Sequence, residues 1–323
     1  MEKRGKRILV GASLAAAGAA MFGAVNNFIR SRLVKLAMSR ELPESVRKGA
    51  EKAVAGEDMV FKTMPEVLAG KEYLENCGCE TVEIRSHDGL KLVGHWYSGK
   101  KPRRVIVAMH GWRSSWSNDF GIISRFWHEN DCAVLYAEHR GQGESGGEYI
   151  SFGLLERFDC FEWVKWVNEK TDLPIYLAGV SMGASTVLMT AGFDLPERVR
   201  GIVADCGFTS PREIWKHVVE NNMHLPYKFY SAGVDGECRK KIQHASDDYS
   251  CVEALRNCKV PVMFVHGSDD KFVPVEMTYE NYKACVSEKR VLIVPGASHG
   301  MSYMTDTAGY QREILEFWAD YDK

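Results

Sequence analysis

The sequence predicts an α/β fold with a mainly parallel central sheet and helices on both faces. Continuous apolar runs, which are typical of strands buried on both faces, alternate with helical patterns along most of the chain. An alternating hairpin precedes the first of these runs, and a strand, a sharp turn and a helix surround Ser181. Strands that alternate with helices indicate parallel pairing, while the hairpin supplies antiparallel strands at one edge.

The individual elements follow from local patterns. The hairpin pairs residues 81–85 with residues 90–97 across a turn at residues 87–89. The buried strands are expected at residues 104–109, 132–137, 175–180, 199–204, 260–265 and 290–294. The helices between and after them are expected at about residues 117–129, 154–169, 182–192 and 307–320.

One connection is too long for a simple loop. Residues 207 to about 257 separate two predicted strands and contain helical stretches and many aromatic residues. A connection of this length needs structure of its own. We therefore expect a small helical cap over the carboxyl-terminal edge of the sheet, where open α/β folds bind ligands.

The main domain is assigned to residues 77–323, cap included. Residues 30–76 are charged and helix-like, with Pro43 and Pro65 as breaks in the helical pattern. We interpret this stretch as a helical linker whose last helix packs onto the domain.

Residues 1–29 are predicted to be a membrane anchor or a signal segment. Residues 8–29 carry no charge over 22 positions and follow a basic start, which fits a single membrane-spanning helix. This favours a membrane-associated protein. A cleaved signal peptide, which implies secretion, and a soluble alanine-rich helix of a cytoplasmic protein are the alternatives.

Composition excludes some classes of partner. The net charge is -2 and 26% of the residues are charged, so nothing marks a nucleic-acid-binding surface. The nine cysteines are interpreted as reduced structural thiols. Cys77 and Cys79 are too close in sequence for an arm of a zinc site, and no paired histidine and cysteine set accompanies them. We expect neither a metal nor a cofactor.

Ser181 stands at the apex of a Gly-x-Ser-x-Gly turn between a strand and a helix, the pattern of a nucleophile elbow. A side chain raised on so tight a turn needs an unusual backbone angle and small neighbours, which Gly179 and Gly183 supply. The helix that follows directs free N–H groups toward the serine, where negative charge develops during acyl transfer.

A serine nucleophile needs a base and an acid, which with this turn follow it along the chain in the order acid, then histidine. Asp270 comes just after the predicted strand at residues 260–265, and His299 lies in a small-residue loop after the last strand. Both belong to the same sheet edge as Ser181. Asp269 is the alternative acid and His266 the alternative base.

The tetrahedral intermediate of acyl transfer needs two N–H donors. We expect one from Met182, the residue after the nucleophile, and the other from the backbone of Trp112 in the loop after the strand at residues 104–109. Gly111 lets that backbone come close, and His110 is expected to be structural.

Residues from about 80 to 323 resemble the α/β-hydrolase superfamily, and within it the bacterial serine esterase and lipase-like branch, including cinnamoyl esterases and monoacylglycerol-lipase-like hydrolases. In that family, His-Gly-x-x-Asp-x-x-Val-Pro favours Asp270 over Asp269 as the acid. Glu138 departs from the aspartate that the family often has, which concerns loop packing. The matching stretches are residues 86–92, 110–112, 139–145, 179–183, 266–274 and 296–300.

The resemblance implies a serine hydrolase that cleaves carboxylic esters through an acyl-enzyme, with a small-molecule substrate such as a lipid or aryl ester. A thioesterase, a peptidase and an acyltransferase share this intermediate and stay open as alternatives. A non-catalytic binding protein on the same fold is less favoured, because no member of the expected triad is missing. The aromatic residues that line a pocket or pack the cap onto the core are Trp112, Trp116, Phe208, Trp215, Tyr227, Phe229 and Tyr230.

Overall fold

The computed structural model of the chain describes residues 26–41 and 58–322. Most of the predicted membrane or signal segment, residues 1–25, lies outside them. Within the described ranges, no helix has the length and apolar character needed to cross a bilayer.

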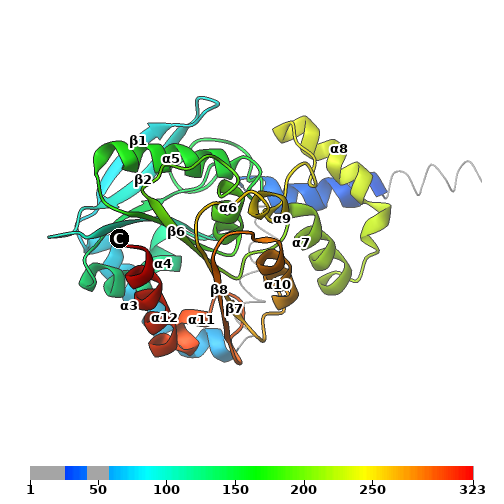
Figure 1. Cartoon of the computed structure of the whole chain (residues 1–323). Coiled ribbons are helices and arrows are strands. Elements are labelled where there is room, and N and C mark those ends of the chain that lie inside the picture. Colours follow the sequence, from blue (N-terminus) through cyan, green and yellow to red (C-terminus); the bar gives the residue numbers. More distant parts are fainter. Residues whose placement is uncertain (1–25, 42–57, 323) are drawn as a thin grey trace, which may run out of the picture.

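Eight strands form one sheet in the order β1-β2-β4-β3-β5-β6-β7-β8 (Figure 1). β1 pairs with β2, and β2 with β4, in antiparallel fashion, and all other pairs are parallel. The confirmed fold is therefore α/β with antiparallel strands at one edge. The strand bounds are β1 Glu80–Arg85, β2 Lys91–Tyr97, β3 Arg104–Met109, β4 Cys132–Ala137, β5 Ile175–Val180, β6 Val199–Asp205, β7 Val262–Gly267 and β8 Lys289–Val294.

Helices cover both faces of the sheet, because successive strand residues point to opposite sides. In β3, Val105 and Val107 face α5 and α6, whereas Ile106 and Ala108 face α4 and α12. β3, β4 and β7 are buried at every residue, which explains their continuous apolar runs. The main helices are α3 Asp58–Asn76, α4 Trp116–Glu129, α5 Glu156–Lys170, α6 Met182–Thr190, α10 Val275–Ala284, α11 Ser302–Thr305 and α12 Thr307–Tyr321.

α3 differs from the sequence prediction, because Pro65 lies inside the helix rather than at a break. Proline removes one backbone hydrogen bond from a helix, which tertiary packing has to offset. α3 packs closely on α4, where Gly70 meets Gly121 so tightly that a Cβ on either residue would strike the opposite backbone. We infer that this packing offsets the backbone hydrogen bond that Pro65 removes, so that the helix continues past the proline.

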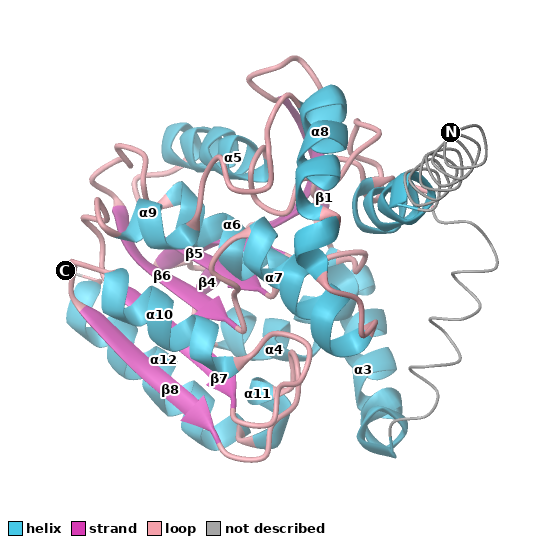
Figure 2. Ribbon diagram, turned by 90° about the vertical axis from the view of Figure 1, so that its right-hand side faces the viewer, coloured by secondary structure: helices cyan, strands magenta, loops and turns pink. Residues whose placement is uncertain are grey.

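The predicted cap segment contains several short helices. α7 and α8 extend beyond the carboxyl ends of β5 and β6 (Figure 2), whereas α9 packs on α6 and α10 in the helical layer of the sheet. Their bounds are α7 Pro211–His217, η1 Val218–Asn222, η2 Tyr227–Phe229, α8 Ser231–Ile242 and α9 Cys251–Leu255.

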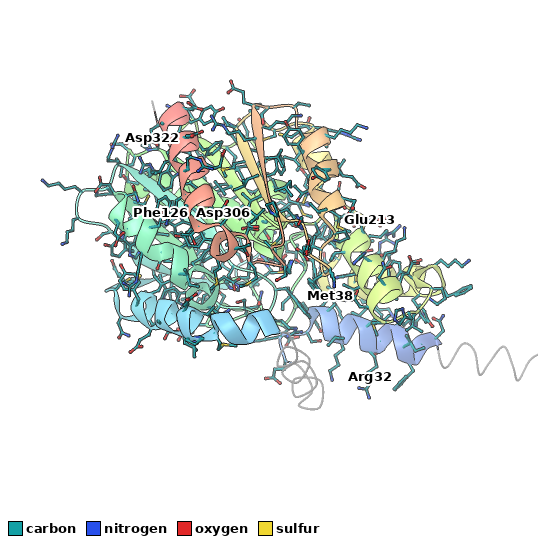
Figure 3. All side chains as sticks on the ribbon, turned by 90° about the horizontal axis from the view of Figure 1, so that it is seen from below. Arg32, Met38, Phe126, Glu213, Asp306 and Asp322 are labelled. Atoms are coloured by element: carbon teal, nitrogen blue, oxygen red, sulfur yellow. The ribbon has the colours of Figure 1, made fainter. Side chains whose placement is uncertain are left out.

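Residues 26–41, most of which the sequence places in a linker, pack as part of the domain. A helix spans residues 26–38 and lies beside α7 and α8 (Figures 1 and 3). Val34 and Met38 on its inner face are fully buried, whereas Arg32 points to solvent. After the helix, Ser39 forms a β-bridge with Tyr149.

We predict that Gly183→Ala destabilises the protein by at least about 3 kcal/mol. A Cβ at Gly183 would overlap the carbonyl oxygen of Met109 at the end of β3, and both groups are backbone, so neither yields cheaply. Urea unfolding measures the loss. Gly236→Ala is the matched control, because Gly236 lies in α8 with open space around it and alanine favours helix. Equal urea midpoints for Gly183→Ala and wild type would contradict this close approach.

Candidate active site

Ser181 occupies the sharp turn between β5 and α6. Its backbone angles are φ 55° and ψ -117°, a positive φ that is rare for a residue with a side chain. The turn is held from both sides, because the Ser181 N–H donates to the Asp205 carbonyl at 2.8 Å and the Ser181 carbonyl accepts from Ser185 N at 3.0 Å. This geometry raises the hydroxyl above the end of the sheet.

The structure brings Ser181, His299 and Asp270 together from three loops at the same sheet edge. His299 Nδ1 lies 2.7 Å from Asp270 Oδ2, and His299 Nε2 lies 2.9 Å from Ser181 Oγ. The Asp270 carboxylate accepts a hydrogen bond from the Nδ1–H group, which leaves Nε2 to accept a hydrogen bond from the serine hydroxyl. A base thus lies within hydrogen-bond distance of the hydroxyl, and an acid orients the base.

Asp270 is held as a carboxylate. Its Oδ1 accepts from the N–H groups of Phe272 and Val273, each at 2.9 Å. Burial raises the pKa of this carboxyl, but hydrogen bonds from His266 and His299 outweigh burial and hold the pKa well below its usual range. The charge needed to orient an imidazolium is therefore present at neutral pH.

The alternative base His266 and the alternative acid Asp269 have other hydrogen-bond partners. His266 is buried and donates from Nε2 to Asp270 Oδ2 at 3.1 Å, while its Nδ1 accepts from Thr278 Oγ1 at 2.7 Å. Asp269 is exposed and accepts from Ser268 Oγ at 2.9 Å. His266 therefore braces the loop of Asp270, and neither alternative contacts Ser181.

The loop after β3 leaves one N–H free where an oxyanion donor is expected. Gly111 N donates to Asp119 Oδ2 at 2.6 Å, and Arg113 N donates to Gln142 Oε1 at 2.7 Å. Across the described residues, no acceptor takes the backbone N–H of Trp112 or of Met182 at the start of α6. Both groups are thus free to donate to a substrate oxygen.

Two residues singled out in the sequence have structural partners. His110 and His139 contact each other, with His139 Nε2 donating to the His110 carbonyl at 2.8 Å, and burial lowers the pKa of both imidazoles. The Glu138 carboxylate accepts from His95 Nε2 at 3.0 Å and from the N–H of Glu144. The Glu138 side chain thereby bonds the backbone of Glu144 and stabilises the loop between these two residues.

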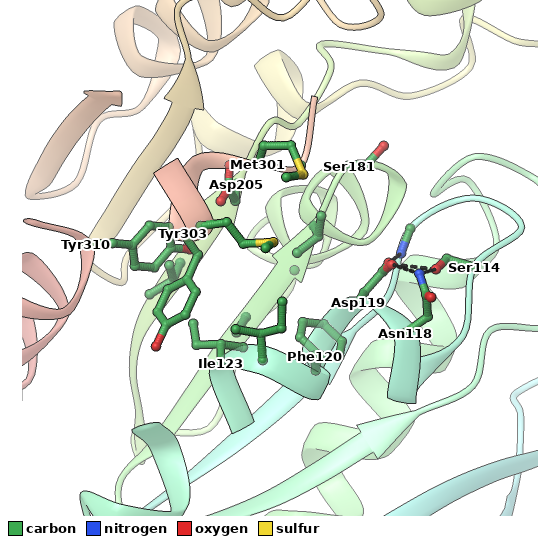
Figure 4. A pocket seen from close by; sticks show the side chains of 18 of the residues that line it. Ser114, Asn118, Asp119, Phe120, Ile123, Ser181, Asp205, Met301, Tyr303 and Tyr310 are labelled. Carbon is green, nitrogen blue, oxygen red and sulfur yellow. Dashed lines mark hydrogen bonds between the residues drawn. The ribbon is translucent and has the colours of Figure 1, made fainter. Parts of the chain in front are cut away.

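A cavity of about 530 Å³ extends from Ser181 and His299 along the α4 and α12 face of the sheet. Figure 4 shows Phe120, Ile123 and Tyr310 among its lining side chains, with the Ser181 hydroxyl pointing away from them. Most of the lining side chains are aromatic or aliphatic.

Asp205 is a residue of this cavity that sequence reasoning missed. It is the last residue of β6, its Oδ1 accepts from Ser302 Oγ at 2.9 Å, and burial raises its pKa. The available signal was a carboxylate at the carboxyl end of an apolar strand.

The thiol of Cys206 lies close enough to Asp270 and His299 for the three to surround one ion. The carboxylate and the imidazole already bond each other, and burial raises the pKa of Cys206 well above that of an ordinary thiol, so its metal-binding thiolate form is disfavoured. The cluster is better explained by the hydrogen-bonded Ser181 site. All nine cysteines are free thiols.

The sheet order, the strained serine turn and its hydrogen-bonded histidine are those of an α/β-hydrolase. Residues 118–323, more than half of the chain, match the prolyl oligopeptidase family. The protein therefore belongs to this family. Its place in the α/β-hydrolase superfamily confirms the sequence resemblance at the level of the superfamily, and this membership supports a hydrolase activity.

Other known proteins resemble the chain over most of its length. It is 30% identical to the non-heme chloroperoxidase CPO-A1 of Kitasatospora aureofaciens over 72% of this chain and 97% of the relative. It is 26% identical to the uncharacterized protein YqkD of Bacillus subtilis over 72% of this chain and 77% of that protein. The Pyrococcus furiosus esterase Pf2001 superimposes with a TM-score of 0.63 at 21% identity, covering 76% of this chain and 92% of the esterase, and this shows a shared fold.

We predict that a fluorophosphonate, which reacts with activated serines, labels Ser181 in the full-length protein. Asp270→Asn should slow labelling by about 10³–10⁴-fold, because the imidazole loses the charge that orients it. Mass spectrometry of the digested protein identifies the modified residue. Asp269→Asn is the matched control and should label at the wild-type rate. Equal rates for the two variants would contradict the assignment of Asp270.

We also predict a pH-dependent stability difference between wild type and Asp270→Asn. The pKa of Asp270 is lower in the folded state than in the unfolded chain, so its bonds stabilise the fold above about pH 4 and lose that effect as the pH falls through the lowered pKa. Urea unfolding at pH 7, 5 and 3 should show a deficit for the variant that shrinks at the lowest pH. A deficit that stays constant would show that the carboxylate charge is not its source.

Proposed function

We propose that the protein is a serine hydrolase that cleaves carboxylic esters through an acyl-enzyme. The observation that carries the proposal is the pair of hydrogen bonds that joins Ser181 Oγ through His299 to Asp270. This arrangement removes a proton from a hydroxyl that is otherwise a poor nucleophile.

The proposed reaction has two halves. Ser181 Oγ attacks the ester carbonyl while His299 Nε2 takes the hydroxyl proton, and Asp270 stabilises the imidazolium. The oxyanion accepts from the N–H groups of Trp112 and Met182. The intermediate collapses, the C–O bond to the alcohol breaks, and His299 returns the proton to the leaving alkoxide. Water, deprotonated by His299, then attacks the acyl-enzyme and releases the acid and the free serine.

The apolar lining of the cavity beside Ser181 supports an ester with a hydrocarbon acyl or aryl group. The fold likeness to an esterase agrees with this substrate class. Membership of the prolyl oligopeptidase family favours a peptidase as the second candidate, because the same acyl-enzyme serves amide substrates.

We further propose that residues 8–25, the part of the uncharged stretch that precedes the packed helix of residues 26–38, attach the protein to a membrane, which is supported by their lack of charge. Sedimentation of the full-length protein with lipid vesicles, compared with residues 26–323, tests this proposal. Equal sedimentation of both would contradict it.

We predict that the full-length protein hydrolyses p-nitrophenyl esters between acetate and palmitate, with an optimum set by the cavity. Ser181→Ala should lower kcat by about 10⁴–10⁶-fold, because it removes the nucleophile. Release of p-nitrophenol measures both.

Equal and negligible turnover by wild type and Ser181→Ala on every ester would contradict the esterase proposal. Cleavage of peptide p-nitroanilides, again lost in Ser181→Ala, would then identify the second candidate.

A further inference from the structure

A second, smaller cavity of about 100 Å³ adjoins the active site. It lies between the helix of residues 26–38 and the helices α7, η1 and α8. Among the residues that the structure describes, every side chain around it is aliphatic or aromatic, and none carries a charge. These residues are Leu33, Val34, Leu36, Ala37, Trp112, Phe152, Ile214, Trp215, Val218, Val219, Met223, Tyr227, Val234 and Phe272.

The two cavities share Trp112 and Phe272 as lining residues. The Phe272 ring contacts the His299 imidazole edge to face, with centroids 5.0 Å apart. Trp112 carries the free N–H proposed for the oxyanion. The second cavity therefore borders two residues next to the active site, and the Ser181 hydroxyl points away from Phe120, Ile123 and Tyr310 of the first cavity (Figure 4).

Specific hydrogen bonds fix the helix of residues 26–38 as the wall of this cavity. The Trp112 indole Nε1 donates to the Ala37 carbonyl at 2.8 Å. The Arg113 guanidinium donates to the carbonyls of Leu36 at 3.0 Å and Arg40 at 3.2 Å, and to that of Ser39. A cation at the carboxyl end of a helix is favoured by the helix dipole. The same loop thus holds the wall and the proposed oxyanion donor.

The opposite side of the cavity contains a residue with a strained backbone conformation. Phe152 has φ 55°, a strained value for an aromatic residue. The buried Glu156 carboxylate holds this turn by accepting from Ser151 N at 2.7 Å and Gly153 N at 2.8 Å. The Phe152 ring then packs edge to face on Trp215, with centroids 5.1 Å apart. Strain maintained in this way is found at functional sites.

We propose that the helix of residues 26–38 is a specificity element whose inner face closes an apolar subsite for one hydrocarbon arm of the substrate. This inference rests on the proposed ester hydrolysis. An uncharged lining disfavours a charged occupant. Because Trp112 and Phe272 border both this cavity and the active-site cavity, we infer that the occupant is part of the molecule bound at Ser181. The volume is smaller than a complete ligand pocket, which suits a single chain.

Binding to the subsite is tested without turnover in full-length Ser181→Ala. The probe is 6-bromo-1-hexanol, whose bromine quenches indole fluorescence on contact, and Trp112 and Trp215 line the cavity. We expect saturable quenching. Adding Ala37→Leu should abolish it, because leucine fills the cavity, whereas Ser31→Leu places the same side chain on the exposed face of the helix and should leave it unchanged.

Only a linear, collisional decrease in fluorescence, identical in all three proteins, would overturn the subsite and identify the cavity as a packing void. This result is independent of whether the protein hydrolyses esters, so failure of the subsite and failure of the proposed function are distinguished.

Steady-state kinetics of proteins that retain Ser181 identify which arm of the ester, acyl or alcohol, enters the subsite. p-Nitrophenyl esters from acetate to decanoate vary the acyl chain, and alkyl butyrates from methyl to octyl vary the alcohol. Ala37→Leu should lower kcat/KM for the longer members of one series by about fourfold per excluded methylene, and leave the shortest members unchanged. Ser31→Leu should leave both series unchanged. If kcat/KM of Ala37→Leu depended on chain length as it does in wild type for both ester series, the proposed specificity role of the helix would be overturned.

Discussion

Ser181 is held at a positive φ by the structure on both sides of it, and this strain determines where its hydroxyl lies. β5 fixes the entry to the turn through its parallel pairing with β3 and β6. α6 fixes the exit, because Gly183 passes so close to the end of β3 that no side chain fits. The loops after β7 and β8 begin at the same sheet edge as Ser181. They therefore place Asp270 and His299 within hydrogen-bond distance of each other, and His299 within hydrogen-bond distance of the fixed hydroxyl.

Most of the fold and the three central residues follow from local sequence patterns. Strands buried on both faces leave uninterrupted apolar runs, so their positions are visible without knowledge of their neighbours. Parallel strands carry their carboxyl ends to one edge, and for that reason residues 118 positions apart, Ser181 and His299, were expected to meet. The family resemblance favours Asp270 over Asp269, and in the structure it is Asp270 of the two aspartates that bonds His299.

The remaining features depend on contacts that local patterns do not contain. Asp205 lies at the end of β6 and bonds Ser302 of α11, a residue 97 positions away in the sequence. The sequence divides the helix of residues 26–38 between an anchor and a linker, because its charged outer face resembles a connecting segment. The loop on which the helix packs contains Trp112, which is 75 residues away from its partner Ala37 and is therefore invisible to a local pattern. The sequence predicts a break at Pro65, because the packing of α3 on α4 cannot be seen in the sequence.

The central claim is that Ser181 carries the acyl group between the two halves of the reaction. The most direct measurement is the mass of the full-length protein quenched in acid within the first turnover of p-nitrophenyl hexanoate. We expect a mass increase of one hexanoyl group, located on the peptide that contains Ser181 and released again on the timescale of turnover. Hydrolysis that proceeds with no such adduct, or with the acyl group on another residue, would contradict it.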